Sequence, residues 1–80
     1  MSEYENYYET NDLALAAALI EQGITYKELD KSDRRRVVFI FANSSKLQIL
    51  IDDYWLDSLK VNPKSYFDTL KHLKTQIYSR

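Results

Sequence analysis

The sequence contains no cysteine and only one glycine, one proline and one histidine in 80 residues. Without cysteine, the chain forms neither a disulfide nor a thiolate metal site. A single glycine excludes a glycine-rich phosphate-binding loop. A single histidine leaves no histidine–carboxylate set that could hold a metal. We therefore expect no metal and no cofactor.

Long apolar runs are missing as well. The longest uncharged stretches, residues 13–20 and 37–45, are far shorter than the roughly 20 residues of a membrane span. The N-terminal residues MSEYENYYE are acidic, whereas a signal or transit peptide is basic. Both features predict a cytoplasmic protein with no membrane partner.

The residues that are present suit one small domain, residues 1–80, because so short a chain has room for a single core. Apolar residues make up 45% of it and charged residues 29%, which is typical of a folded chain. The net charge of −1 hides an acidic N-terminal part and a basic C-terminal part. These parts either pair in the fold or present opposite charges to partners.

The first half of the chain predicts one helix and a β-hairpin. Residues 10–23, TNDLALAAALIEQG, begin with capping residues and end at the only glycine. We expect a helix over 12–22, with Thr10 or Asn11 as N-cap and Gly23 just beyond its end. Residues 24–42 predict the hairpin, with DKSD as its turn. Its second strand is apolar on both faces, as central strands are, so residues 4–9 are expected to add an edge strand.

Two further helices are expected in the second half. Ser45 with Gln48 fits a capping box and predicts a helix over 46–57, while Asn62 followed by Pro63 predicts one over 63–78. The fold class is therefore α+β, in the order (β)αββαα, with an antiparallel hairpin or three-stranded sheet against three helices. Residues with helical spacing are expected in the core: Leu47, Leu50, Ile51, Tyr54 and Trp55 in one helix, and Tyr66, Phe67, Leu70, Leu73 and Ile77 in the other.

Four blocks carry a family resemblance: YYETNDLALAAALIEQG, DRRRVVFIF, DDYW and NPKSYFDTLKHLKTQIY. Together they resemble a family of small bacterial and mobile-element- or phage-associated proteins that is classed as a domain of unknown function. The resemblance extends from Tyr7 to Tyr78. It implies no activity and no site residues.

No catalytic set is predicted. His72, the sole histidine, is expected on the exposed side of the last helix, without the positioned partner that a general base needs. Asp52 and Asp53 are neighbours on a helix and point about 100° apart, so they do not converge on a shared proton. We therefore expect a protein that is not an enzyme.

The first candidate function is a protein-binding module, of the kind that a phage or mobile element uses to modulate or inhibit a host complex. Alternating acids and tyrosines at the N-terminus suit a basic protein groove, although the tyrosines could instead close the core. The alanine side of helix 12–22 is a second contact candidate, a homodimer included, and Ala14→Arg with Ala18→Arg is expected to leave the fold intact. The candidate contacts are Glu3, Tyr4, Glu5, Tyr7, Tyr8, Glu9, Ala14 and Ala18.

The alternative is a nucleic-acid-binding accessory or regulatory domain. Three consecutive arginines could clamp phosphates, or they could pair across the hairpin with Glu28, Asp30 or Asp33. The last helix carries lysines beside aromatic rings, as single-strand binders do, but Asp68 neutralises part of that edge. A net charge of −1 argues against strong non-specific binding. The candidate contacts are Arg34, Arg35, Arg36, Lys64, Lys71, Lys74 and Tyr78.

Overall fold

The computed structural model describes residues 6–33 and 35–78. Its elements are β1 (Tyr7–Thr10), α1 (Leu13–Glu21), β2 (Tyr26–Asp33), β3 (Arg36–Ala42), α2 (Ser45–Trp55) and α3 (Pro63–Tyr78). The strands form an antiparallel sheet in the order β1-β3-β2, so the apolar strand β3 is central as predicted. The α+β class and the order of elements are confirmed. The edge strand begins at Tyr7, and residues 4 and 5 of the predicted strand lie outside the described residues.

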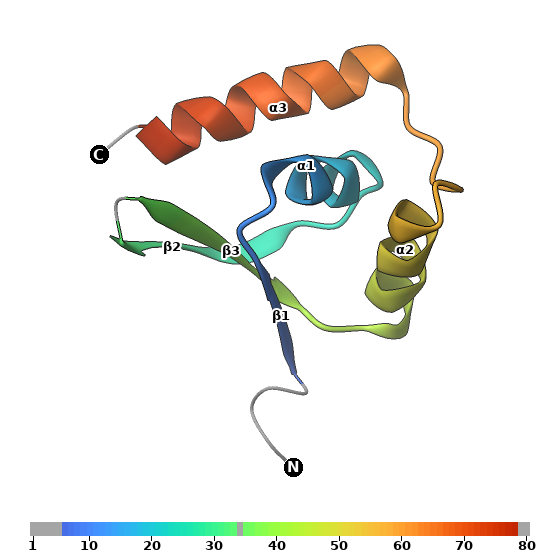
Figure 1. Cartoon of the computed structure of the whole chain (residues 1–80), viewed down its shortest axis with the longest axis horizontal. Coiled ribbons are helices and arrows are strands. Elements are labelled where there is room, and N and C mark those ends of the chain that lie inside the picture. Colours follow the sequence, from blue (N-terminus) through green and yellow to red (C-terminus); the bar gives the residue numbers. More distant parts are fainter. Residues whose placement is uncertain (1–5, 34, 79–80) are drawn as a thin grey trace.

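Helix α1 lies between the sheet and α3, with α2 at one side (Figure 1). The core forms where α1 meets the sheet, and its largest fully buried side chains include Phe39 and Phe41 of β3 and Leu15 and Leu19 of α1. Leu73 of α3 is also fully buried. In the part of the chain that the structure describes, no helix is both long enough and apolar enough to cross a bilayer.

The alanine side of α1 is buried, which corrects the expectation that it forms a contact surface. Ala17 is fully buried, Ala18 is 2% exposed, and Ala14 is half-buried. Because the sheet, α2 and α3 surround α1, this helix is covered nearly all round, as its apolar composition allows. Small side chains also let α3 come close, and the Tyr66 hydroxyl donates a hydrogen bond to the Ala14 carbonyl at 3.3 Å. Ala17 is therefore not available to another chain, and the alanine side of α1 offers no broad contact surface.

The N-cap of α1 differs from the prediction, whereas the C-terminal end of the helix agrees with it. Asp12 is the N-cap instead of Thr10 or Asn11, and its Oδ1 accepts hydrogen bonds from two backbone N–H groups of the first turn. Gly23 has a φ of 97° just beyond the C-cap, as predicted. The N–H of Gly23 donates to the Ile20 carbonyl at 2.9 Å, and the next N–H donates to Leu19, which is a Schellman motif.

Helix α2 begins one residue earlier than predicted. Ser44 is the N-cap, and its hydroxyl accepts from the N–H of Leu47 at 3.0 Å. The Gln48 amide donates to the side chain of Asn43, so no capping box forms with Ser45. Two consecutive serines offer the same chemistry, and the extended backbone at Ser44 decides between them.

The hairpin turn also differs from the prediction. DKSD is part of β2, which continues to Asp33, and Asp33 faces Arg36 across the hairpin. The Asp30 carboxylate accepts from the N–H of Ser32 at 2.9 Å, and this hydrogen bond holds the pKa of Asp30 below its usual value. Pairing is irregular between Asp30 and Asp33, so the turn-forming residues bend the strand locally while the strand continues.

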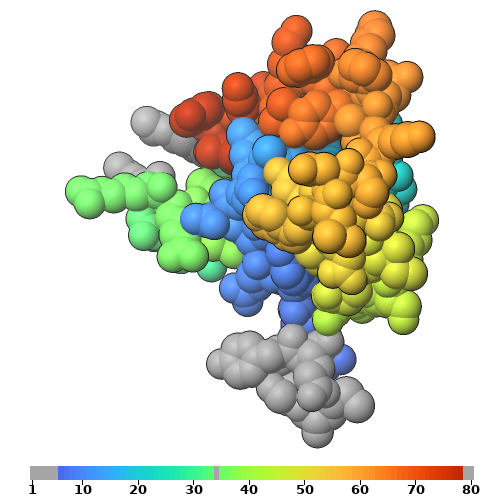
Figure 2. Space-filling model, turned by 45° about the vertical axis from the view of Figure 1, so that its right-hand side comes forward, coloured from blue at the N-terminus to red at the C-terminus, as the bar shows by residue number. Residues whose placement is uncertain are grey.

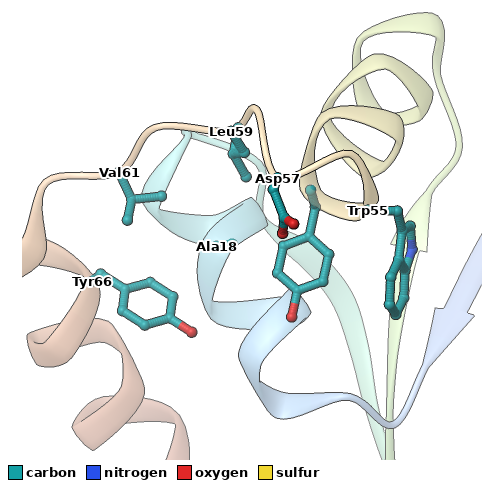
Figure 3. A pocket seen from close by; sticks show the side chains of 7 residues that line it. Ala18, Trp55, Asp57, Leu59, Val61 and Tyr66 are labelled. Carbon is teal, nitrogen blue, oxygen red and sulfur yellow. The ribbon is translucent and has the colours of Figure 1, made fainter.

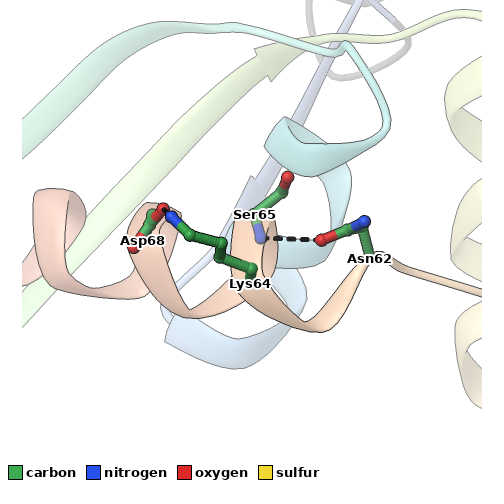
Figure 4. Close-up of polar contacts among 4 residues, drawn as sticks. All are labelled: Asn62, Lys64, Ser65 and Asp68. Carbon is green, nitrogen blue, oxygen red and sulfur yellow. Dashed lines mark hydrogen bonds and ion pairs between the residues drawn. The ribbon is translucent and has the colours of Figure 1, made fainter.

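Helix α3 begins as predicted. The Asn62 side chain accepts a hydrogen bond from the N–H of Ser65 at 3.0 Å, and Pro63 occupies the first helical position (Figure 4). Lys64 and Asp68 form an ion pair at 3.1 Å one turn along the same helix. The charge of Lys64 is thus partly neutralised within the helix.

Candidate functional site

The N-terminal candidate residues lie on opposite faces of the sheet. Tyr8 packs against the core, where burial raises the pKa of its hydroxyl and the Asp12 carboxylate raises it further. Tyr7 and Glu9 alternate with Tyr8 along the strand, so they lie on the face away from the helices. Three other predicted contacts lie outside the described residues: Glu3, Tyr4 and Glu5.

That open face of the sheet carries a hollow of about 500 Å³, lined by Tyr7, Glu9, Lys27, Glu28 and Ile40. Lys27 extends from β2 across the central strand, and its Nζ lies 5.6 Å from the centroid of the Tyr7 ring. The chain therefore already supplies a cation to this aromatic ring and these two acids.

The basic candidate residues do not all lie at one end of the molecule: Arg36 begins β3 at the hairpin and Lys74 lies near the end of α3, whereas Lys64 lies on the first turn of that helix. Lys31 of β2 donates a hydrogen bond to the Gln76 carbonyl of α3, which brings the hairpin beside the end of that helix (Figure 1). Arg35 and Arg36 are exposed, and within residues 6–33 and 35–78 neither forms an ion pair with Glu28, Asp30 or Asp33. Arg34 lies outside the described residues. Three further candidates on α3 are exposed: Lys71, Lys74 and Tyr78.

The polar residues considered for catalysis do not converge. His72 is exposed on α3, as predicted. Asp52 is exposed, and Asp53 accepts hydrogen bonds at its backbone carbonyl from the N–H groups of Ser58 and Leu59. Among the described residues, no group of three or more His, Asp or Glu side chains could hold a metal ion.

A different site lies between the end of α2, the loop of residues 56–62 and the start of α3. There the surface is hollowed by about 400 Å³, with Ala18 of α1 among the residues that line it (Figure 3). In Figure 2 this side of the molecule comes forward, and α2, the loop and α3 form one continuous yellow-to-orange surface. The other lining residues are Tyr54, Trp55, Asp57, Leu59, Val61 and Tyr66.

Two residues expected in the core are exposed at or beside this hollow. Trp55 is 64% exposed and Phe67 is 60% exposed, so the predicted helix stripes are wrong at these two positions. Each directly follows a half-buried tyrosine, Tyr54 or Tyr66. Consecutive helical residues point about 100° apart, so a contact that covers the tyrosine leaves the next ring outside. The Tyr-Trp and Tyr-Phe pairs are the sequence signal that could have indicated an aromatic surface.

The rings are in contact within each pair. The centroids of Tyr54 and Trp55 are 5.1 Å apart and those of Tyr66 and Phe67 are 5.9 Å apart, both in edge-to-face geometry. One pair comes from α2 and the other from α3, with the hollow between the two helices (Figure 3). The helices therefore hold aromatic rings on two sides of the same space.

Asp57 supplies the only charged side chain among the lining residues. It follows the C-cap of α2 with a φ of 58°, the left-handed region. Its N–H donates to the Tyr54 carbonyl at 3.2 Å, and the N–H of Ser58 donates to Asp53 at 2.9 Å. This is the same Schellman arrangement as at Gly23, but with aspartate where glycine is favoured. The carboxylate points from the loop into the hollow (Figure 3).

The two tyrosine hydroxyls of the hollow are kept in their neutral form. Burial raises the pKa of Tyr54 and of Tyr66, and the carboxylate of Asp12 raises both further. Asp57 adds to the effect on Tyr54. The carboxylates of Asp12 and Asp57 therefore both lie close enough to Tyr54 to raise its pKa. No nucleophile–base pair is present among the lining residues.

Comparison with known proteins identifies a family. A family model described as "Domain of unknown function (DUF5659)" matches residues 5–79 of the chain. No curated protein and no solved structure matches.

Proposed function

The chain belongs to the DUF5659 family, a domain of unknown function, and from its surface we propose that it is a non-enzymatic protein-binding module. The observation that carries this proposal is the hollow between α2 and α3, which the exposed Trp55 lines, with two further exposed apolar residues next to lining residues in the sequence, Leu56 and Phe67. Trp55, Leu56 and Phe67 are 60% exposed or more. Exposed apolar groups gathered on one surface are typical of protein-interaction sites.

The composition of this surface supports a protein partner. Tryptophan and tyrosine are enriched among the residues that dominate binding energy at protein interfaces. The half-buried Tyr54 and Tyr66 anchor the exposed rings of Trp55 and Phe67, so part of the surface is held in place before a partner arrives. The open face of the sheet is less suited to this role, because Lys27 already lies over its aromatic residue.

The proposal includes a setting for the module. Following the resemblance to phage- and mobile-element-associated proteins, the partner is part of a host complex that the module modulates or inhibits. The proposed location is the cytoplasm, which the lack of cysteine permits.

The experiment is affinity capture from the native host with two matched variants. Trp55→Ala combined with Phe67→Ala removes both exposed rings of the surface. Ile49→Ala is the control, because Ile49 is also 60% exposed and lies on α2 but does not line the hollow. We expect the wild type and the control to capture the same protein and the double variant to lose it. Equal capture by all three would contradict the proposal.

A second candidate function is nucleic-acid binding at the opposite end of the molecule. The observation that favours it is the Lys31–Gln76 hydrogen bond, which brings the hairpin, with Arg35 and Arg36, beside the end of α3, where Lys74 lies. The net charge of −1 and the Lys64–Asp68 ion pair argue against it.

The second candidate is tested by titrating labelled duplex and single-stranded DNA and RNA at low and at physiological salt. Phosphate binding predicts an affinity that falls steeply with salt and falls again in Arg35→Ala/Arg36→Ala. If neither nucleic acid binds at low salt, this alternative is wrong.

A further inference from the structure

We propose that the hollow between α2 and α3 takes the side chain of an arginine presented by the partner protein. This inference rests on the proposed function and specifies its chemistry. The residues that carry it are Tyr54, Trp55, Tyr66 and Asp57. They combine aromatic rings with one carboxylate, which is how proteins recognise organic cations.

The rings provide the first part of the argument. Tyr54 and Trp55 approach from α2 and Tyr66 from α3, so a group between the helices would contact more than one ring. A cation over the face of an aromatic ring is attracted by the ring quadrupole, by about 0.5–2 kcal/mol according to exposure. A planar guanidinium also stacks on such faces, which an ammonium group does not do.

The charges around the hollow provide the second part. Asp57 points into it, and Asp12 is close enough to raise the pKa of Tyr54 and Tyr66. No lysine, arginine or histidine lines it. Lys64, on the first turn of α3, is held by Asp68. The space is therefore complementary to a cation.

The backbone at Asp57 provides the third part. The left-handed conformation after a helix favours glycine, and a negative side chain is unfavourable at a helix C-terminus. An aspartate here is thus disfavoured for two separate reasons. A residue held in such a conformation is a reason to look for a function, and a bound guanidinium would supply one.

The size of the hollow is compatible with this occupant. About 400 Å³ is within the range of small-molecule sites and accepts a guanidinium with part of its alkyl stem. Leu59 and Val61 line the hollow and offer apolar contact to the stem, while Leu56 and Phe67 remain exposed for the flanking residues of the partner.

The test uses two blocked tripeptides, Leu-Arg-Leu and Leu-citrulline-Leu, which differ in charge but hardly in shape. Trp55 is the only tryptophan, so its fluorescence reports binding at the hollow directly. We expect the arginine peptide to bind about tenfold more tightly than the citrulline peptide. Asp57→Asn should reduce this preference while keeping the side-chain shape, because it removes the carboxylate and leaves the rings. Asp52 is an exposed acid of α2 that does not line the hollow, so Asp52→Asn should keep the preference for the arginine peptide.

Equal binding of the two peptides by the wild type, or an unchanged preference in Asp57→Asn, would overturn the inference. Tighter binding of a lysine peptide than of the arginine peptide would also contradict the inference, because the planar guanidinium would then have no role. If the two peptides bind equally while capture of the partner still depends on Trp55 and Phe67, the inferred arginine site is wrong and the proposed function stands. If the arginine peptide is preferred but capture does not depend on Trp55 and Phe67, the protein-binding function is wrong and the hollow remains a cation site.

Discussion

At the scale of single residues, the two helix ends at Gly23 and Asp57 are the most informative pair. Both residues have positive φ, and both close a Schellman motif. Glycine is the residue that this position favours, and aspartate is not. Gly23 therefore suits the backbone conformation that it adopts, whereas we propose that Asp57 is present because the hollow requires its carboxylate.

Replacing Gly23 with alanine should lower the free energy of unfolding by about 1 kcal/mol. No atom lies within 4 Å of the added Cβ, so the whole effect comes from the backbone conformation. Denaturant unfolding measures it. An unchanged midpoint would show that alanine adopts the φ of 97° at position 23 without a measurable loss of stability.

Replacing Asp57 with glycine should have the opposite sign and raise the free energy of unfolding by about 0.5–1 kcal/mol. The same variant should show a smaller preference for arginine over citrulline. A variant that is more stable and yet binds less well identifies Asp57 as a residue of the site. If Asp57→Gly is destabilised, the carboxylate has a structural role instead.

At the scale of elements, the sequence predicts which segments become helices and strands better than it predicts how they meet. Capping residues, the only glycine and proline, and the apolar central strand indicate all six elements. Between adjacent candidates such as Ser44 and Ser45, local chemistry does not decide. The hollow was not predictable, because it depends on which of two consecutive aromatic residues α1 covers. That is set by the docking of three helices, which the pattern of one helix does not contain.

The correction at the start of α2 can be measured. Ser44→Ala should destabilise the protein by about 1 kcal/mol, because it removes the acceptor for the N–H of Leu47. Ser45→Ala is the matched control, and it should change stability by less than about 0.5 kcal/mol. Equal effects of the two substitutions would mean that the cap is not at Ser44.

The packing of α1 makes a second prediction at this scale. Ala17→Arg should prevent folding at ambient temperature, because a charged side chain would replace a fully buried methyl group that does not line the hollow. Ala42→Arg, at an exposed position, should leave the protein folded. Circular dichroism distinguishes these outcomes. A folded Ala17→Arg protein would show that this side of α1 is not covered.

At the scale of the whole molecule, three tyrosines link stability to alkaline pH. Burial raises the pKa of Tyr8, Tyr54 and Tyr66 above the usual 10.0. A raised pKa in the folded state means that the proton is bound more tightly there than in the unfolded chain. The resulting stability is present below about pH 10 and is lost as the pH rises through the folded-state values.

Unfolding measured at pH 8 and at pH 11 should therefore show a loss of stability, which Tyr66→Phe should reduce because it removes one of the three titrating groups. At pH 8 the variant should be destabilised by about 1 kcal/mol or less, since the Tyr66 hydroxyl donates one hydrogen bond. The same alkaline loss in both proteins would show that Tyr66 does not contribute to the pH dependence.

The molecule also separates its two candidate surfaces. The aromatic hollow lies where α2 ends and α3 begins, while the arginines of the hairpin and the end of α3 lie at the other end (Figure 1). The two candidate surfaces therefore lie apart on the molecule.

The most direct test is a map of amide chemical-shift changes on the isotope-labelled chain when the captured partner is added. The account predicts that the largest changes lie at residues 54–61 and 66–67 and at the indole N–H of Trp55. Changes confined to the exposed face of the sheet, or to the hairpin with the end of α3, would contradict it.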